Sequence, residues 1–279
     1  MLFRSGLVLS GARNLVLMIR KDLIGYERVR SSGNGWKKKL RIAYQWTCES
    51  MCIRSAAQVI CQCAYDRDVI LNRHPLLKKK AASKFDIQIN NINPSWIVKR
   101  DSESEAETND TGRFRICFIG GFDDLRKGQD LFLDAAKSLE SRHPELEFVL
   151  AGGGKRLQNY RDRFESDRIR FVGRLDNPMP LLKSSDLLVV PSLADSCPNT
   201  VMEALYTGVP VIGSKAGGIP EILMDEEALF DTNPEAVSER IERMIKDRSA
   251  LERLRERQNR RAKELTFDWA ERIMEIVQK

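Results

Sequence analysis

Hydrophobic and polar positions alternate in blocks along the second half of the chain. Five short hydrophobic runs predict buried strands, at 114–119, 147–152, 169–173, 186–191 and 209–213. Stretches of helical period between and after them predict helices, at 128–142, 155–166, 177–184, 199–207 and 219–224. Short hydrophobic runs joined by helices are typical of βαβ units, in which helices cover both faces of a parallel sheet. The pattern therefore predicts a Rossmann-like α/β domain over residues 112–265.

Residues 1–100 show the same pattern in a weaker form. Hydrophobic runs at 15–19 and 58–63 predict strands, and the segment 38–56 between them predicts a helix. This amounts to about one and a half βα units, which is too few for a sheet that is stable by itself. We therefore predict a partial Rossmann-like domain in this part of the chain.

Changes in composition divide the chain into four segments. Residues 1–100 form the partial N-terminal domain, and the acidic, polar stretch 101–112 predicts a linker. Residues 113–265 form the complete Rossmann-like domain. A helical segment over 266–279 ends the chain, and we expect it to pack back toward the N-terminal part.

The composition is that of a globular protein, with 42% hydrophobic and 31% charged residues. The net charge of +6 is unevenly distributed: residues 1–100 hold 19 Lys and Arg against 6 Asp and Glu, a balance of +13, and the rest hold 27 against 34, a balance of −7. A basic front part favours an anionic partner, such as acidic lipid headgroups or a phosphorylated acceptor. The alternative is that runs such as 37–39 and 78–80 are solvated faces. We expect no nucleic acid, because aromatic residues do not alternate with the basic ones as in a recognition motif.

Cysteine spacing and hydropathy bear on location and metal binding. No apolar run is long enough to predict a membrane span or an export signal, so we expect a cytoplasmic protein with reduced cysteines, with peripheral contact at the inner face of a membrane as an open alternative. The pairs Cys48/Cys52 and Cys61/Cys63 have helical and strand spacing. That spacing fits a hydrophobic core better than a zinc site.

Glycines and basic residues follow the first predicted strand of the Rossmann-like domain. In open α/β sheets, ligands bind beyond the carboxyl ends of the strands. Gly120 and Gly121 allow the backbone to approach a ligand closely, and Arg126 and Lys127 supply positive charge. A second glycine-rich turn, which contains Gly218, follows the last predicted strand.

Two acids flank the start of the helix predicted at 199–207. The backbone amides near Asn199, Thr200 and Val201 can hold a diphosphate without a metal ion. Glu203, which we place in the first helical turn, can accept hydrogen bonds from vicinal hydroxyls such as those of a ribose. Asp195 on the preceding loop can face a polyol or a developing positive charge. The set predicts a site for a nucleotide that a diphosphate joins to a sugar.

These motifs resemble the donor-sugar domain of retaining glycosyltransferases of family 4, which have the GT-B fold. The motifs that match stand in the family's order: Arg126-Lys127-Gly128, Phe171-Val172-Gly173-Arg174, Ser185-Asp186, Pro191-Ser192, Asp195, Glu203-Ala204, Gly208-Val209-Pro210-Val211, Gly217-Gly218-Ile219-Pro220-Glu221 and Phe267-Asp268-Trp269. The resemblance covers 113–223 and the C-terminal helix. It implies a GT-B fold, with a Rossmann-like donor domain and a partial Rossmann-like N-terminal domain.

The resemblance also implies an activity and roles for residues. The activity would be transfer of a sugar from a nucleotide-diphosphate donor with retention of anomeric configuration and without a metal ion, in polysaccharide or glycolipid synthesis, to an anionic or lipid-linked acceptor. Glu203 would hold the ribose, and Asp195 would contact the transferred sugar. Lys127 and the helix amides would neutralise the leaving diphosphate, and Gly173 and Arg174 would complete the donor site.

Three departures from the family's pattern fall in the donor site. Asp195 stands where the family usually has Glu, one methylene longer. Ser196 and Cys197 replace a glycine-aromatic pair, which affects the choice of donor. Gly121 stands where an arginine is common, and Arg126 is the candidate to take its place. Asp123-Asp124 is expected to be an exposed turn rather than a metal motif.

The largest departure is at the front of the chain. Segments 15–22, 56–70 and 89–96 resemble the middle and end of the family's acceptor domain, but its first glycine-rich loop and its active-site histidine are not found. His74 and His143 each precede a proline and are expected to be structural or solvated. The sequence therefore leaves two hypotheses open. One is an active glycosyltransferase, truncated or completed by a partner chain, and the other is a non-catalytic nucleotide-sugar-binding or regulatory subunit.

Overall fold

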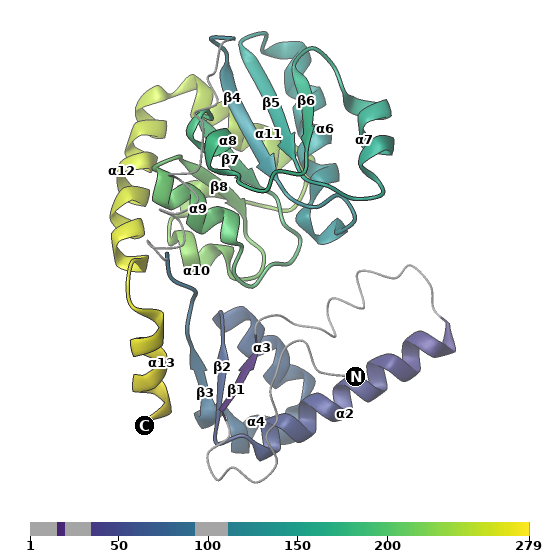
Figure 1. The fold of residues 1–279 in the computed structure, drawn as a ribbon, viewed down its shortest axis with the longest axis vertical. Coiled ribbons are helices and arrows are strands. Elements are labelled where there is room, and N and C mark those ends of the chain that lie inside the picture. Colours follow the sequence, from purple (N-terminus) through teal and green to yellow (C-terminus); the bar gives the residue numbers. More distant parts are fainter. Residues whose placement is uncertain (1–15, 20–34, 93–110, 279) are drawn as a thin grey trace. The chain divides into compact units, whose positions relative to one another are not determined.

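The computed structural model of the chain describes residues 16–19, 35–92 and 111–278 (Figure 1). Contacts divide the chain into two compact units: unit 1 is residues 1–90 with 268–279, and unit 2 is residues 91–267. Most of the predicted linker at 101–112, part of the segment 89–96, and residues 15 and 20–22 lie outside the described residues.

Unit 2 is built on a parallel sheet of six strands in the order β6-β5-β4-β7-β8-β9. The strands are β4 (Phe114–Ile119), β5 (Leu146–Ala151), β6 (Ile169–Gly173), β7 (Leu187–Val190), β8 (Val211–Ser214) and β9 (Leu229–Phe230). The five predicted strands are confirmed as β4 to β8, and β9 was not predicted. β5, β7 and β8 are buried along their whole length, because helices cover both faces of the sheet, and this explains their continuous hydrophobic runs.

The order of the strands reverses beside β4. The chain runs outward from β4 to β5 and β6, then returns to β7 on the other side of β4. Ile116 of β4 pairs with Leu187 of β7, so the two strands are direct neighbours. The carboxyl ends of strands at such a switch point form the usual ligand crevice of open α/β sheets.

Seven helices and two 3₁₀ turns surround the described part of this sheet. The helices are α6 (Gln129–Arg142), α7 (Leu157–Phe164), α8 (Met179–Lys183), α9 (Asn199–Thr207), α10 (Ile219–Leu223), α11 (Pro234–Lys246) and α12 (Arg248–Leu265), and the turns are Leu125–Lys127 and Glu226–Ala228. Asn233 and Asp247 cap α11 and α12 by accepting hydrogen bonds from backbone amides of the first turn. The five helices predicted between the strands are confirmed as α6 to α10.

Unit 1 holds a smaller parallel sheet in the order β1-β2-β3. Its elements are β1 (Val16–Ile19), α2 (Trp36–Ser55), β2 (Gln58–Cys61), α3 (Ala64–Arg73), α4 (Pro75–Ala81), a 3₁₀ turn (Ala82–Lys84), β3 (Phe85–Ile87) and α13 (Trp269–Val277). The predicted strand at 58–63 ends at Cys61. Cys63 lies beyond the strand, where its sulfur accepts the amide of Asp66 and caps α3.

The helical segment predicted at 266–279 forms α13, a helix separate from α12. α12 ends at Leu265, and Asp268 starts α13 by accepting the amides of Ala270 and Glu271 at 2.8 and 3.0 Å. α13 belongs to unit 1, and the side-chain amide of Gln58 donates to the carbonyl of Ile276 at 2.6 Å. Within the described residues, every helix is too short or too polar to span a lipid bilayer.

Candidate functional site

The predicted donor-site residues lie in loops that leave the carboxyl ends of the strands of unit 2. Gly120 and Gly121 follow β4, Gly173 ends β6, and Gly218 lies in the turn after β8. The loop 191–198 follows β7 and leads into α9. Parallel strands bring these loops to one edge of the sheet, on both sides of the β4/β7 switch point (Figure 1).

Two glycines hold the loop 191–198 against its neighbours. Gly128 has a φ of +71°, and a Cβ there would lie 1.9 Å from the carbonyl oxygen of Pro191. Gly217 has a φ of +61°, and a Cβ there would lie 2.1 Å from the carbonyl oxygen of Asp195. Only glycine fits where a left-handed backbone and so close an approach coincide. The conformation of this loop therefore depends on both positions.

Backbone hydrogen bonds fix the same loop at two points. The amide of Leu193 donates to the carbonyl of Arg126 at 2.6 Å, and the amide of Gly218 donates to the carbonyl of Asp195 at 2.9 Å. The sequence analysis predicts that Gly218 contacts the donor. In the structure, its amide instead holds the backbone of Asp195 in place. The loop after β7 is tied to the loops after β4 and β8.

This arrangement brings Lys127 and Asp195 together. The Lys127 Nζ lies 2.5 Å from the Asp195 Oδ2, and both side chains are part-buried. The two residues are far apart in the sequence, and the adjacency of β4 and β7 makes them neighbours. An ammonium and a carboxylate side by side can stabilise charges of both signs, negative on a leaving group and positive on a sugar ring.

The start of α9 lies next to this pair in the sequence. Pro198 precedes the helix in an extended conformation, and no described side chain caps it. The amide of Val201 donates to the carbonyl of Pro198 at 3.1 Å. Contrary to the prediction, this amide is therefore not available to bind an anion. The amides of Asn199 and Thr200 point out of the helix end by the geometry of an α-helix, and an anion is favoured there.

The position of Glu203 differs from the prediction, which places this residue in the first turn of the helix. α9 begins at Asn199, because the backbone of Pro198 before it is extended, so Glu203 is its fifth residue and the first turn holds no acid. Its side chain is buried, with 4% of the residue exposed. A buried carboxylate is costly unless it is well hydrogen-bonded.

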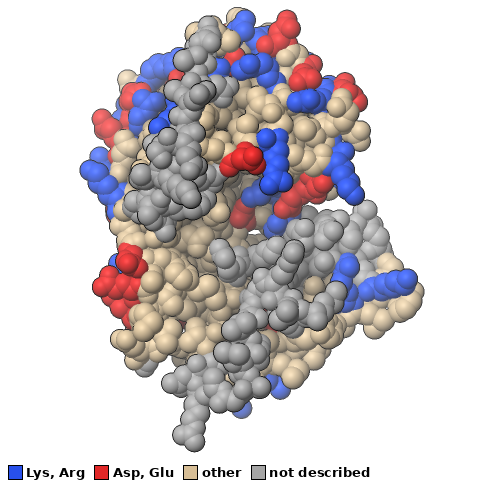
Figure 2. Space-filling model, viewed as in Figure 1, with Lys and Arg blue, Asp and Glu red and all other residues tan. Residues whose placement is uncertain are grey.

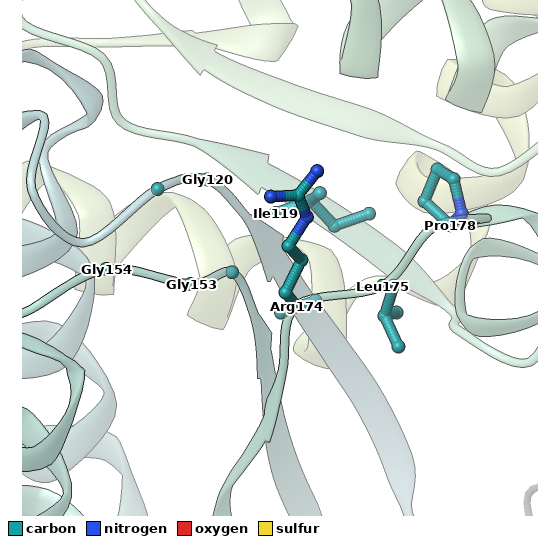
Figure 3. Close-up of a pocket in the computed structure, with 10 residues that line it drawn as sticks. Ile119, Gly120, Gly153, Gly154, Arg174, Leu175 and Pro178 are labelled. Atoms are coloured by element: carbon teal, nitrogen blue, oxygen red, sulfur yellow. The ribbon is translucent and has the colours of Figure 1, made fainter.

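A cavity of about 510 Å³ opens beside the ends of β4, β5 and β6 (Figure 3). It is lined by Ile119, Gly120, Gly121, Ala151, Gly152, Gly153, Gly154, Arg174, Leu175 and Pro178. Figure 3 shows Arg174 extending between the backbone of Gly120 and Pro178. The volume of the cavity is within the usual range for small-molecule sites.

The predicted residues therefore fall into two groups. Gly120, Gly121 and Arg174 line the cavity, whereas Lys127, Asp195, Glu203, Gly173 and the α9 start do not. Gly120 connects the groups, because a Cβ there would lie 3.3 Å from the Cβ of Lys127. Both groups lie at one edge of the sheet.

The loop Gly152–Gly154 is a part of the cavity that sequence reasoning missed. Three consecutive glycines after the second hydrophobic run were a visible signal. Asp123 holds this loop: its Oδ1 accepts the amide of Arg156 at 3.2 Å. Hydrogen bonds from the backbone of Lys155 and Arg156 lower the pKa of Asp123. Asp123 is exposed, as predicted, but it ties the loop after β4 to the loop after β5.

Arg126 and the two histidines make contacts of other kinds. The Arg126 guanidinium pairs with the Asp124 carboxylate, with Nη2 2.7 Å from Oδ2. His74 is buried in unit 1 with its Nε2 2.8 Å from Glu49 Oε1. His143 contacts Glu145 and Glu242. In the described part of the chain, no three His, Cys, Asp or Glu side chains gather as a metal site would require.

Comparison with known proteins relates the chain to a large family. Residues 99–264 match the sequence model of the family described as glycosyl transferases group 1. Spore coat protein SA of Bacillus subtilis is 26% identical over 289 residues, which cover 95% of this chain and 72% of that protein. The N-acetyl-alpha-D-glucosaminyl L-malate synthase of Bacillus anthracis is 29% identical over 55% of this chain and 40% of that protein, so the match spans less than half of that relative.

A solved structure supports the fold. The crystal structure of Anabaena HepE in complex with UDP superposes with a TM-score of 0.70 at 20% identity and covers 95% of this chain and 72% of that chain. The predicted GT-B-type α/β fold is confirmed. The same Anabaena protein has also been solved in complex with UDP-glucose.

Proposed function

Because the chain belongs to the glycosyl transferases group 1 family, we propose that it transfers a sugar from a nucleotide-diphosphate donor, with retention of anomeric configuration and without a metal ion. The observation that carries this proposal is the contact of Lys127 with Asp195 beside the uncapped start of α9. The pair lies at the switch point of the sheet, where a donor would be expected.

The proposed chemistry is a cleavage at the anomeric carbon. The bond between this carbon and the phosphate oxygen breaks, and its electron pair leaves with the nucleoside diphosphate. Lys127 and the amides of Asn199 and Thr200 meet the negative charge that grows on the diphosphate. Asp195 faces the positive charge that grows on the sugar ring. An acceptor hydroxyl then bonds to the anomeric carbon from the face that the diphosphate leaves, and its proton passes to the leaving diphosphate oxygen.

The base of the nucleoside would occupy the cavity, and its ribose would lie toward the group of residues that contains Glu203. The cavity at Gly120, Gly153 and Arg174 offers backbone that can approach a base closely and one cationic side chain. Glu203 would accept hydrogen bonds from the ribose hydroxyls. Anabaena HepE binds UDP and UDP-glucose, so UDP-sugars are the first donors to test.

Fewer observations support the proposal for the acceptor. The resemblance and the basic front part favour an anionic or lipid-linked acceptor in polysaccharide or glycolipid synthesis. The second candidate function is a non-catalytic nucleotide-sugar-binding or regulatory subunit, which would use the same donor site without transferring the sugar.

Titration calorimetry with UDP, GDP and ADP and their sugars tests the donor site. We expect Lys127→Ala to weaken binding of the best ligand by at least about tenfold, since a charge-assisted contact to phosphate is lost. Lys137→Ala is the matched control, because Lys137 lies exposed on α6 and pairs only with Glu140 among the described residues. Equal binding by Lys127→Ala and the unchanged chain would overturn the proposed site.

A second measurement separates the two candidate functions. Release of UDP from a UDP-sugar, or transfer of a labelled sugar to a lipid extract, would show catalysis. Asp195→Asn should then lower the rate by about 10²–10³, the usual loss when an electrostatic stabiliser is removed, and leave donor binding intact. Tight donor binding with neither reaction would favour the regulatory subunit.

A further inference from the structure

Helix α2 of unit 1 exposes a continuous apolar face. Trp36, Leu40, Tyr44 and Met51 are 67%, 59%, 65% and 63% exposed. At 3.6 residues per turn, these four positions fall within an arc of about 80° on the helix surface. Large apolar side chains gathered on one face are unusual for a water-facing helix and indicate a binding surface.

The opposite side of α2 is anchored in the core of unit 1. Ile53 is buried against Leu17, Val59 and Ile70, and the Nζ of Lys84 donates to the carbonyl of Ala56, just beyond the helix end, at 2.8 Å. The core thus holds the C-terminal part of α2. The exposed face is therefore a fixed feature of a helix already held in place by its other side.

Basic residues flank the apolar face on both sides. Lys37 and Arg41 lie on one flank and Lys39 on the other, and all three are exposed. The Lys37 Nζ lies 5.8 Å from the centroid of the Trp36 ring. Figure 2 shows Lys and Arg side chains beside uncharged ones over the end of α2. From residue 36 to residue 48 the sequence contains no acid.

Helix stability does not explain these charges. The positive end of the helix dipole lies at the N-terminus, so lysines in the first turn are unfavourable there. The first acid of α2, Glu49, is bound to Arg73 and His74. Lys37 and Lys39, which are exposed at the start of α2, can therefore meet an anionic partner beside the apolar face.

We propose that α2 binds the surface of a bilayer that contains anionic lipids. Trp36, Leu40, Tyr44 and Met51 would enter the boundary between headgroups and acyl chains, and the flanking cations would meet lipid phosphates. A second copy of the chain is a poorer occupant, because its own α2 would present the same cations. The proposal goes beyond sugar transfer and does not depend on it.

Sedimentation of the full chain with vesicles tests the proposal. We expect binding to phosphatidylcholine vesicles that contain phosphatidylglycerol, little binding to phosphatidylcholine alone, and weaker binding as salt is added, since surface charges are screened. The triple variant Trp36→Ser/Leu40→Ser/Tyr44→Ser and the double variant K37E/K39E should each lower partitioning by about tenfold or more.

Matched variants outside α2 serve as controls. Leu76→Ser removes an exposed leucine of α4, which is 87% exposed, and K79E/K80E reverses two exposed lysines of the same unit. Each should change partitioning by less than about twofold. Circular dichroism melts of every variant show that it is folded, and the blue shift of tryptophan fluorescence on vesicles should shrink in Trp36→Phe.

Three outcomes would overturn the proposal. The first is equal sedimentation with neutral and anionic vesicles, and the second is an equal loss in the α2 and control variants. The third is a concentration-dependent dimer in light scattering that the triple variant abolishes, which would assign the α2 face to a second copy of the chain.

Discussion

The two sheets of this chain differ in how completely their own unit covers them. In unit 2, all four residues of β7 and all four of β8 are buried. In unit 1, only Leu17 of the four residues of β1 is buried. Nine of the twelve exposed large hydrophobic residues in the described part of the chain belong to unit 1, although it is the smaller unit.

This difference separates two uses of apolar surface. Parallel sheets are stable when helices cover both faces, and unit 2 meets this condition with its own helices. Its surface is then available for a precise polar site at the strand ends. Unit 1 leaves apolar surface exposed on α2, which suits a partner that is itself apolar and extended. The donor site and the proposed lipid surface thus lie in different units.

The largest expected effect would come from breaking the interior of unit 2. Arg115 of β4 and Glu147 of β5 face each other in the sheet, where they form a buried ion pair. Arg115 also donates to the Ser184 hydroxyl at 2.8 Å. We expect Glu147→Ala to lower the free energy of unfolding of unit 2 by roughly 3–5 kcal/mol, since it leaves a buried guanidinium without its carboxylate.

Urea unfolding followed by circular dichroism, with hydrogen exchange to assign the loss to β4 and β5, measures this effect. Glu165→Ala is the control. It removes an exposed partner of Arg161 at 4.0 Å on the same unit and should cost about 0–1 kcal/mol. Equal losses of unfolding free energy in the two variants would mean that the buried ion pair stabilises unit 2 no more than an exposed pair does.

The sequence could predict most of unit 2 because its strands are buried on both faces. β4 to β8 show as hydrophobic runs for that reason. β9 holds two residues and β3 three, which is too short to produce a period. α11 carries an Asn-Pro start, a helix signal that was present in the sequence and was not used.

The placement of the candidate site residues beyond the strand ends was predictable, but their arrangement relative to one another was not. Asn199, Asp195 and Lys127 lie at strand ends as expected, yet the contact of Lys127 with Asp195 depends on β7 lying beside β4, which a sequence alone does not fix. The position of Glu203 in α9 depended on the first helical residue, and helix boundaries are the least certain part of a sequence prediction. The role of Asp123 depends on the loop after β5, which lies one helix and one strand further along the chain.

A smaller effect is expected from matched helix caps in the two units. Asp268 caps α13 of unit 1 and Asn233 caps α11 of unit 2, where its side-chain oxygen accepts the amide of Ala236 at 2.8 Å. Replacing either by alanine should cost about 1 kcal/mol. Because unit 1 has the smaller core, we expect Asp268→Ala to increase hydrogen exchange through α13 and β2, and Asn233→Ala to affect only α11.

Hydrogen exchange resolved by peptide distinguishes these outcomes. If Asp268→Ala increases exchange only in the first turn of α13, the stability of the rest of unit 1 does not depend on its C-terminal helix. This result would also weaken the view that unit 1 covers its own sheet less completely than unit 2 does.

The smallest expected effect concerns Asp123, which sharpens the description of the donor site within unit 2. Hydrogen bonds from the backbone of Lys155 and Arg156 lower its pKa. A carboxylate with a lowered pKa stabilises the folded loop above its ordinary pKa of about 4, and this contribution is lost as the pH falls through the lowered value. Hydrogen exchange of the peptide over 152–157, corrected for its intrinsic pH dependence, should therefore be slower in the unchanged chain than in Asp123→Asn from pH 7 to about 5, and the difference should disappear at lower pH. Asp231→Asn, which removes an exposed acid 3.9 Å from Lys215, should show no such difference in this peptide. A constant difference at every pH would mean that Asp123 holds the glycine loop by its shape and not by its charge.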